Sequence, residues 1–299
     1  MIKEFPKIFS IGTKYILDIF DGPVEITEKI DGSQFSFAKI ADGLYFRSKG
    51  QELYDPAIPK MFMEGVKYLK SISDDIPPGL VFYCEYLQKP RHNALKYNRT
   101  PDNHLALFAV RNFSDGSFDT EFTMKGYAGK LGIDYVPVLY YGTINAPLEI
   151  MDFMQKESYL GGAKIEGVVV KNYAKDLILG GHVSPIMCGK FVSEEFKEVN
   201  QKSFKDNSGK NKFEEYKDSF RTEARWQKAV QHLRDAGTLT GDPKDIGPLI
   251  REVVTDIEAE EGENIKEWLY KNYRAEILRK STAGIAEWYK MALLEGNNG

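Results

Sequence analysis

The chain has 299 residues, of which 42% are hydrophobic and 13% aromatic. This length favours two domains over one, and the composition is sufficient for a sizeable buried core. The formal net charge of −4 and the isoelectric point near 5.8 exclude a uniformly basic surface, so a nucleic acid would have to meet a local basic patch.

The same sequence predicts a cytoplasmic protein. Residues Met1–Pro6 lack the apolar core of a signal peptide, and no apolar run approaches the length that spans a membrane. Cys84 and Cys188 lie far apart and match neither a disulfide framework nor a metal clip. We therefore expect a soluble protein of a reducing compartment, in the cytosol of a microbe or a phage host, with no membrane partner.

The part of the chain before residue 200 predicts a mixed structure in which strands outnumber helices. Apolar and alternating runs between short turns predict strands at Val24–Thr27, Ser33–Ile40, Leu44–Arg47, Leu80–Leu87, Leu105–Val110, Tyr135–Tyr141, Ile165–Lys171 and Ile186–Val192. Helical patterns occur at Ala57–Ser71, Thr123–Leu131 and Pro147–Ser158. Because many strands are joined by short Gly and Asp turns, we expect the α+β class with a largely antiparallel sheet.

The pattern changes near residue 200. Gln201–Lys212 is polar and rich in lysine and asparagine, which is typical of a linker. Beyond it, apolar residues recur at helical spacing in Glu214–Ala236, Pro248–Glu260 and Asn264–Leu294. The sequence therefore predicts one domain over residues 1–205 and an all-helical C-terminal domain over residues 213–299.

The pentapeptide Glu28–Gly32 places Lys29 between a strand and a loop that leads into a second strand. A lysine on such a rigid frame is suited to act as an amine nucleophile. The alternative is an exposed lysine in an ordinary Asp-Gly hairpin turn. The pentapeptide alone leaves both interpretations open.

Three later segments carry charges at the ends or in the middle of apolar strands. Glu166 begins a β-branched run that ends at Lys171, and a carboxylate beside a glycine can hold a divalent metal close to phosphate. Glu85 and Lys190 each interrupt an apolar strand, where a charge is costly unless it is paired or binds a ligand. Lys29, Glu85, Glu166 and Lys190 follow one another in this order along the chain, and their chemistry together favours a nucleotide site.

These residues, taken in order, resemble the motifs of covalent nucleotidyltransferases, and in particular of RNA ligase 2-like enzymes. Lys29–Gly32 resembles the KxxG motif, Arg47 lies in a strand like the one whose arginine faces substrate phosphate, and Glu85 and Phe108 match the ribose-binding acid and purine-stacking aromatic. Glu166–Lys171 and Lys190 match the last two motifs. The resemblance covers about residues 20 to 200 and implies an antiparallel-sheet nucleotidyltransferase domain of the ATP-grasp-like ligase type.

The resemblance implies catalytic roles for Lys29, Glu166 and Lys190, with Glu166 as the metal ligand. It implies an ATP site that contains Glu28, Ile30, Gly32, Arg47, Glu85, Phe108, Lys171 and Lys190. ATP is then the donor of AMP, and Mg²⁺ or Mn²⁺ is the metal. In one respect the chain departs from the family, because the last motif usually has two lysines separated by one residue and here has only Lys190, flanked by Cys188 and Val192. Lys171 or the metal could take over the charge of the missing lysine, or adenylylation could be weaker.

The implied reaction has three steps. Lys29 attacks the α-phosphorus of ATP, AMP passes from the lysine to an RNA 5′-phosphate, and a 3′-hydroxyl displaces AMP and seals the strand. The amine must be neutral to attack, and a nearby cation such as Lys190 or a metal would disfavour its protonated form.

RNA is favoured over DNA because DNA ligases of this superfamily continue with a β-barrel, whereas this chain becomes helical. The segment that follows Glu85 mixes cations with a tyrosine and is a candidate RNA contact through Lys89, Arg91, His92, Lys96 and Arg99. We expect a monomer that acts on RNA ends, in nicked duplexes or single strands. A DNA ligase, a capping guanylyltransferase and a non-catalytic RNA-binding module with the same fold are the alternatives.

Overall fold

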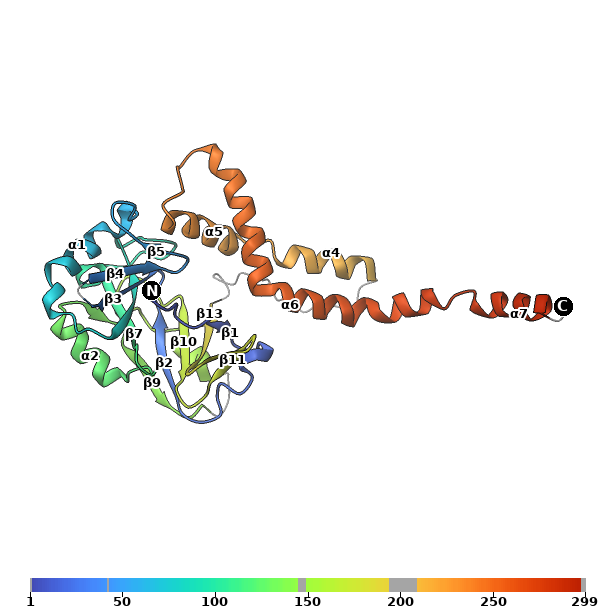
Figure 1. Cartoon of the computed structure of the whole chain (residues 1–299), viewed down its shortest axis with the longest axis horizontal. Helices are drawn as coiled ribbons and strands as arrows, with labels where there is room; N and C mark the ends of the chain where they lie inside the picture. The colour runs from blue at the N-terminus through green and yellow to red at the C-terminus, as the bar shows by residue number, and fades with distance from the viewer. Residues whose placement is uncertain (1, 42, 145–148, 194–208, 297–299) are drawn as a thin grey trace. The chain divides into compact units, whose positions relative to one another are not determined.

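The computed structural model describes residues 2–41, 43–144, 149–193 and 209–296, with side chains left undescribed at 209–211 and 295–296 (Figure 1). The chain divides into two compact units, residues 1–249 and 250–299. The domain division expected between residues 205 and 213 lies largely outside the described residues, and it stays a prediction.

Two sheets make up most of the first unit. The five-stranded sheet has the order β1 (Phe9–Ser10), β13 (Met187–Val192), β10 (Gly167–Asn172), β2 (Val24–Lys29) and β9 (Val138–Gly142). The six-stranded sheet has the order β5 (Glu52–Leu53), β4 (Gly43–Ser48), β3 (Ser33–Ile40), β6 (Leu80–Tyr86), β7 (Leu105–Asn112) and β8 (Asp134–Tyr135). All neighbouring pairs are antiparallel except β1–β13 and β7–β8. The structure thus confirms the α+β class with antiparallel-rich sheets and a helical C-terminal region.

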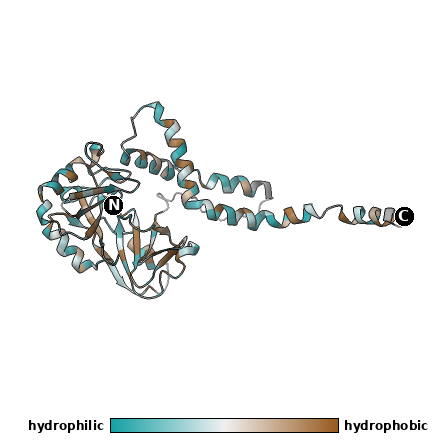
Figure 2. Ribbon diagram, viewed as in Figure 1, coloured by the Kyte–Doolittle hydropathy of each residue, from teal (hydrophilic) through white to brown (hydrophobic). Residues whose placement is uncertain are grey.

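Each sheet packs apolar side chains on both of its faces. Figure 2 shows hydrophobic residues interspersed along the strands of both sheets. The outer face of the six-stranded sheet packs on helices α1 (Met63–Ser71) and α2 (Glu121–Lys130), through a buried cluster that includes Phe37, Phe82, Val66, Leu69 and Met124. The outer face of the five-stranded sheet is covered by η1 (Lys14–Ile16) and α3 (Ile150–Phe153). A third cluster, with Ala38, Tyr83 and Cys188, fills the space between the sheets.

Most predicted strands begin and end within two residues of the observed strands. The prediction of a single strand at Tyr135–Tyr141 was wrong. This segment consists of β8 and β9, which belong to different sheets. The break falls at Val136–Pro137, because proline has no N–H to donate to a strand ladder. Four short strands were not predicted: β1, β5 and the hairpin of β11 (Leu177–Leu179) and β12 (His182–Ser184). Two-residue and three-residue strands carry too little alternation to be recognised.

The predicted helix Ala57–Ser71 begins later, with η2 (Lys60–Phe62) before α1, and Pro147–Ser158 shortens to α3, with residues 145–148 outside the described chain. Three further one-turn helices are η3 (Ser73–Asp75), η4 (Asp102–His104) and η7 (Pro243–Asp245). Glu214–Ala236 forms two helices, α4 (Gly209–Ser219) and α5 (Glu223–Asp235). Thr222 separates them, because its side chain accepts the Arg225 N–H and caps α5.

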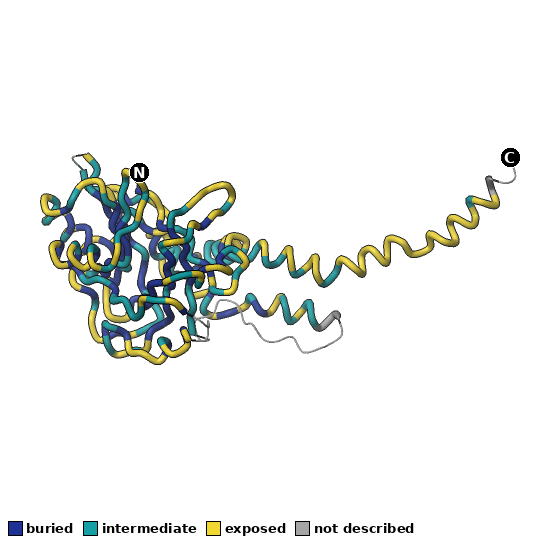
Figure 3. The backbone as a smooth tube through the Cα atoms, turned by 90° about the horizontal axis from the view of Figure 1, so that it is seen from below, coloured by how far each residue is buried: buried dark blue, intermediate teal, exposed yellow. Residues whose placement is uncertain are grey.

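The predicted break near residues 261–263 was wrong, since α6 runs without interruption over Ile246–Ser281. Gly262 is tolerated inside this helix, whereas Gly284, with φ of +86°, separates α6 from α7 (Ile285–Gly296). Figure 3 shows that most residues of the second unit are exposed. No helix in the described part of the chain has the length and apolar character needed to cross a membrane.

Candidate nucleotide site between the two sheets

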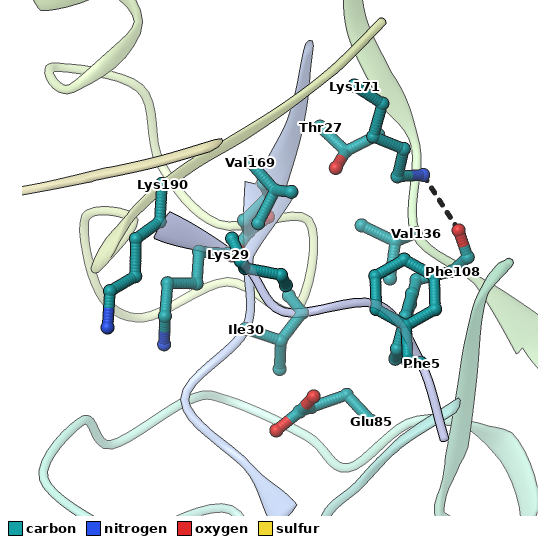
Figure 4. A pocket seen from close by; sticks show the side chains of 12 residues that line it. Phe5, Thr27, Lys29, Ile30, Glu85, Phe108, Val136, Val169, Lys171 and Lys190 are labelled. Carbon is teal, nitrogen blue, oxygen red and sulfur yellow. Dashed lines mark hydrogen bonds between the residues drawn. The ribbon is translucent and has the colours of Figure 1, made fainter. Parts of the chain in front are cut away.

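Strand register brings the charged residues of the five-stranded sheet onto one face. Lys29, the last residue of β2, lies opposite Gly167 of β10, and Thr27 lies opposite Val169. Val169 in turn lies opposite Lys190 of β13. Because residues two apart in a strand share a face, Lys29, Val169 and Lys190 point into the same pocket, as Figure 4 shows. The pocket lies between the two sheets.

Lys29 is held by a carboxylate in this pocket. Its Nζ donates to both oxygens of Glu166, at 2.8 Å to Oε1 and 2.6 Å to Oε2. Burial lowers the pKa of Lys29, but Glu166, Glu85 and Asp31 together raise this pKa above its usual range. Burial also raises the pKa of Glu166, an effect that Lys29 and Lys190 partly offset. The amine is therefore an ammonium ion in this pocket, and an ammonium ion is not nucleophilic.

The six-stranded sheet supplies the opposite wall. Glu85 of β6 and Phe108 of β7 both line the pocket. Burial raises the pKa of Glu85 to about 8, although the charge of Lys29 acts to lower it. The Phe5 ring meets the Phe108 ring edge-on, at a centroid distance of 5.0 Å and an interplanar angle of 86°. Phe5 thus packs edge-on against Phe108 and holds this ring in place at the pocket.

Lys171 also lines the pocket, but its ammonium group is already paired. Its Nζ lies 2.9 Å from Glu25 Oε1 and donates to the Phe108 carbonyl at 2.7 Å (Figure 4). The Tyr173 hydroxyl donates to the same Glu25 oxygen at 3.1 Å. Lys171 lies directly across the β10–β13 ladder from Cys188, which is one of the two positions, with Val192, where the second lysine could be expected. Its charge is thus next to that position but compensated by Glu25.

The residues of the KxxG segment have three different surroundings. Glu28 borders the pocket, but its carboxylate accepts the Tyr159 N–H at 3.0 Å, and burial raises its pKa. Ile30 lines the pocket and is buried. Gly32 has no room for a side chain, because an added Cβ would lie 2.7 Å from Glu85 Cγ and 2.8 Å from the Tyr86 carbonyl oxygen. A glycine here allows the loop to pass directly over strand β6.

Arg47 is not among the residues that line the pocket, and it pairs with Glu4. The five predicted RNA contacts separate into two groups. Lys89, Arg91 and Lys96 are exposed, and Arg99 is exposed but paired with Asp134 at 2.6 Å. His92 is buried at 6% exposure, with both ring nitrogens in hydrogen bonds inside the protein. The nucleotide and RNA contacts of these residues stay predictions.

Five lining residues were not predicted from the sequence: Phe5, Ile8, Thr27, Val136 and Val169. Alternation from Lys29 and Lys171 would have identified Thr27 and Val169, because each lies two residues away on the same strand. Val136 lies in the link between β8 and β9. Phe5 and Ile8 lie before β1 and reach the pocket by long-range packing, which no local pattern in the sequence predicts.

The carboxylates of the site suit a metal that is shared with a ligand. The described residues contain no group of three or more His, Cys, Asp or Glu side chains that could hold a metal alone. Mg²⁺ usually binds through one or two carboxylates together with substrate phosphates. Glu166, whose carboxylate contacts the pocket residue Lys29, fits that arrangement.

Comparison with known proteins decides the family. A sequence model of the RNA ligase family matches residues 22–182, slightly more than half of the chain. This chain belongs to the RNA ligase family. The match confirms the RNA ligase 2-like assignment, and it contains Lys29, Glu85, Phe108 and Glu166 but ends before Lys190.

Three solved structures of the RNA ligase of Naegleria gruberi are similar to this family member. The complex with pyrophosphate has 16% identity and a TM-score of 0.46, over 64% of this chain and 56% of that chain. A mutant with ATP and Mn has 16% identity and a TM-score of 0.49, with the same coverage. A ligand-free mutant has 18% identity and a TM-score of 0.44, over 64% of this chain and 57% of that chain. The chain thus spans little more than half of these proteins. No curated protein matches the sequence significantly.

Proposed function

We propose that this chain is an ATP-dependent RNA ligase that joins 5′-phosphate and 3′-hydroxyl ends through a lysyl-AMP intermediate. The observation that carries the proposal is the position of Lys29. Its amine lies at the end of a strand, in a pocket between two sheets, with both oxygens of Glu166 within 2.8 Å.

The other lining residues suit an adenine nucleotide. Phe108, supported by Phe5, offers a ring for the base, and Glu85 offers a carboxyl group for the ribose hydroxyls. Lys190 supplies positive charge on the same face as Lys29, where negative charge would develop on the phosphate. Adenine, ribose and phosphate would then lie along one pocket, with the phosphate end near Lys29.

The first step forms a bond between Lys29 Nζ and the α-phosphorus and breaks the bond to pyrophosphate, which leaves. AMP then passes to the RNA 5′-phosphate, and attack by a 3′-hydroxyl releases AMP and seals the strand. Lys29 must lose a proton before it attacks, and Glu166 holds the amine in position for this loss. A divalent cation bound by Glu166 and the nucleotide phosphates would supply the positive charge that replaces the ammonium beside this carboxylate.

Incubation with α-labelled ATP tests the proposal. The wild-type chain should retain the label as a protein adduct in the presence of Mg²⁺ or Mn²⁺, and α-labelled GTP should leave no adduct. Lys29→Ala and Lys29→Arg should both lose the label, because arginine preserves the charge beside Glu166 but is not a comparable nucleophile. Lys175→Ala is the control, since Lys175 pairs with Asp18 at the surface.

Labelling of Lys29→Ala would show that another residue accepts AMP. Labelling by GTP alone would favour a capping guanylyltransferase, and absence of any adduct would favour a non-catalytic RNA-binding module. Sealing of nicked duplex RNA, single-stranded 5′-phosphate RNA and nicked DNA, measured in parallel, would then identify the substrate.

A further inference from the structure

The loop that follows Lys29 is held on one side by the segment of residues 92–97. Asp31 Oδ2 accepts the backbone N–H groups of Ala94 at 2.8 Å and Leu95 at 2.7 Å. The Asp31 N–H donates to the Tyr97 hydroxyl at 2.9 Å. Asp31 is therefore fixed in place by contacts on both its backbone and its side chain.

Helix α5 holds the same loop from a distant part of the sequence. Gln231 Nε2 donates to the Gly32 carbonyl at 2.5 Å, and the Ser33 hydroxyl donates to Asp235 Oδ1 at 2.7 Å. Asn93 Nδ2 donates to the Gly32 carbonyl as well, at 2.9 Å. Arg234 joins the two sides, because its NH1 donates to Asn93 Oδ1 at 3.0 Å. All these residues belong to the first compact unit.

The buried chain of hydrogen bonds through Ser33 has one consistent direction. The Gln88 N–H donates to His92 Nδ1 at 3.0 Å, so Nδ1 carries no proton. Neutral His92 then carries its proton on Nε2, which lies 2.9 Å from Ser33 Oγ and donates to it. The Ser33 hydroxyl in turn donates a hydrogen bond to Asp235 Oδ1. Burial, together with Arg234 and Lys89, lowers the pKa of His92 to about 4, which keeps the ring neutral.

This arrangement differs from the triad of a hydrolase. In that triad histidine lies between serine and the acid and removes the serine proton. Here Ser33 lies between His92 and Asp235, is completely buried, and donates away from the ring. The network therefore fixes position and does not activate a nucleophile.

Asp235 has a costly location for a purely structural contact. It is 6% exposed, and burial raises its pKa to about 7. A buried carboxylate is weak evidence for stability, because desolvation opposes the gain from its hydrogen bonds. The contact fixes Ser33, four residues from the lysine, beside Gly32, where an added Cβ would lie 2.8 Å from the Tyr86 carbonyl oxygen.

We propose that helix α5 is a positioning element for the nucleophile: Gln231 and Asp235 act through Gly32 and Ser33 to hold Lys29 in its reactive place. The inference rests on the proposed lysyl-AMP function. It extends that function to a helix that lies beyond the residues resembling the family motifs and beyond the family match, which ends at residue 182. A displacement of about 1 Å at a reacting atom can lower a rate on the order of a hundredfold.

The test compares two glutamines of α5 in the full chain. Gln231→Ala should slow single-turnover labelling by α-labelled ATP at least about tenfold at saturating ATP, with less than about a twofold change in the half-saturating ATP concentration. Gln227→Ala is the matched control, because the hydrogen bond that Gln227 donates within the described residues goes to Glu223, one turn earlier in the same helix. It should label at the wild-type rate.

Asp235 provides the rescue experiment. Asp235→Ala should slow labelling as Gln231→Ala does, whereas Asp235→Asn retains an oxygen that accepts the Ser33 hydroxyl and should restore most of the rate. If Asp235→Ala does not fold, the comparison of Gln231→Ala with Gln227→Ala still decides. Equal labelling rates in these two variants would refute the role of α5. Absence of labelling in the wild-type chain would instead refute the lysyl-AMP function itself.

Discussion

The buried pair of Lys171 and Glu25 gives the sharpest prediction about stability. The two side chains are 1% and 4% exposed, and their charged atoms lie 2.9 Å apart. Lys171→Met would leave Glu25 buried with only the Tyr173 hydroxyl, and it would remove the donor to the Phe108 carbonyl. Breaking a buried pair in this way costs about 3–5 kcal/mol of unfolding free energy.

This cost should lower the midpoint of thermal unfolding by roughly 6–20 °C, as followed by circular dichroism or calorimetry. Glu25→Gln/Lys171→Met removes both charges and keeps an acceptor for Tyr173, so it should recover most of the loss. A coupling free energy of about 2 kcal/mol or more is expected from the double-mutant cycle. A loss below about 1 kcal/mol in Lys171→Met, or a double variant as unstable as the sum of the singles, would refute the reasoning.

The same double variant separates two roles of Lys171. Because it restores the charge balance of the pocket wall, any remaining weakening of ATP binding would come from a lost contact with the nucleotide. Unchanged ATP binding would mean that Lys171 does not replace the missing second lysine. At Cys188, one of the two candidate positions for that lysine, burial raises the thiol pKa to about 12 and leaves the side chain uncharged. ATP binding is measured by titration with ATP in a Lys29→Arg background, which prevents AMP transfer to the lysine, with and without Glu25→Gln/Lys171→Met.

Three further outcomes follow from the site. The rate of lysyl-AMP formation should rise with pH from about pH 6, because carboxylates raise the Lys29 pKa and only the neutral amine attacks. Equal rates at about pH 6 and about pH 8 in rapid-quench measurements would contradict this. Gly167→Ala should lower the free energy of unfolding, measured by urea titration, by about 1–3 kcal/mol, because its Cβ would lie 2.3 Å from the Phe191 carbonyl oxygen. A free energy of unfolding equal to that of the wild type would show that the strands move apart at little cost. Burial raises the Glu85 pKa to about 8, so the folded state binds a proton that the unfolded state has already released at neutral pH. The free energy of unfolding should therefore fall as the pH rises towards about 8. In urea titrations at about pH 6 and about pH 8.5, this fall should be smaller in Glu85→Gln than in the wild type by at least about 1 kcal/mol.

The sequence predicts the strands and their charged residues well, but not the partners of these residues. Ser33–Ile40 coincides with β3 because its alternation is regular. In β2, the same alternation of side chains determines which residues share a face with Lys29. Whether Lys171 faces a nucleotide phosphate or Glu25 depends on the register of β2 against β10, which is a long-range property. Charge type and periodicity alone carry no information about it.

The C-terminal helices show the same limit. Helical spacing predicts that Glu214–Ala236 is helical, but a helix of mixed charge gives no indication of the surface it contacts. The bond from Gln231 to Gly32 joins residues 199 positions apart. Likewise, burial of His92 is not visible in a segment whose neighbours Lys89, Arg91 and Lys96 are all exposed cations.

The two walls of the pocket are tied together by very short pieces of chain. Residues 30–32 join β2 of one sheet to β3 of the other, and residues 136–137 join β8 to β9 in the opposite direction. A chain of two or three residues spans at most about 10 Å when fully extended, so these tethers limit how far the sheets can move apart at this edge. The width of the cleft between the sheets is therefore nearly fixed at this edge, and any closure over a bound ligand would have to come from other parts of the protein.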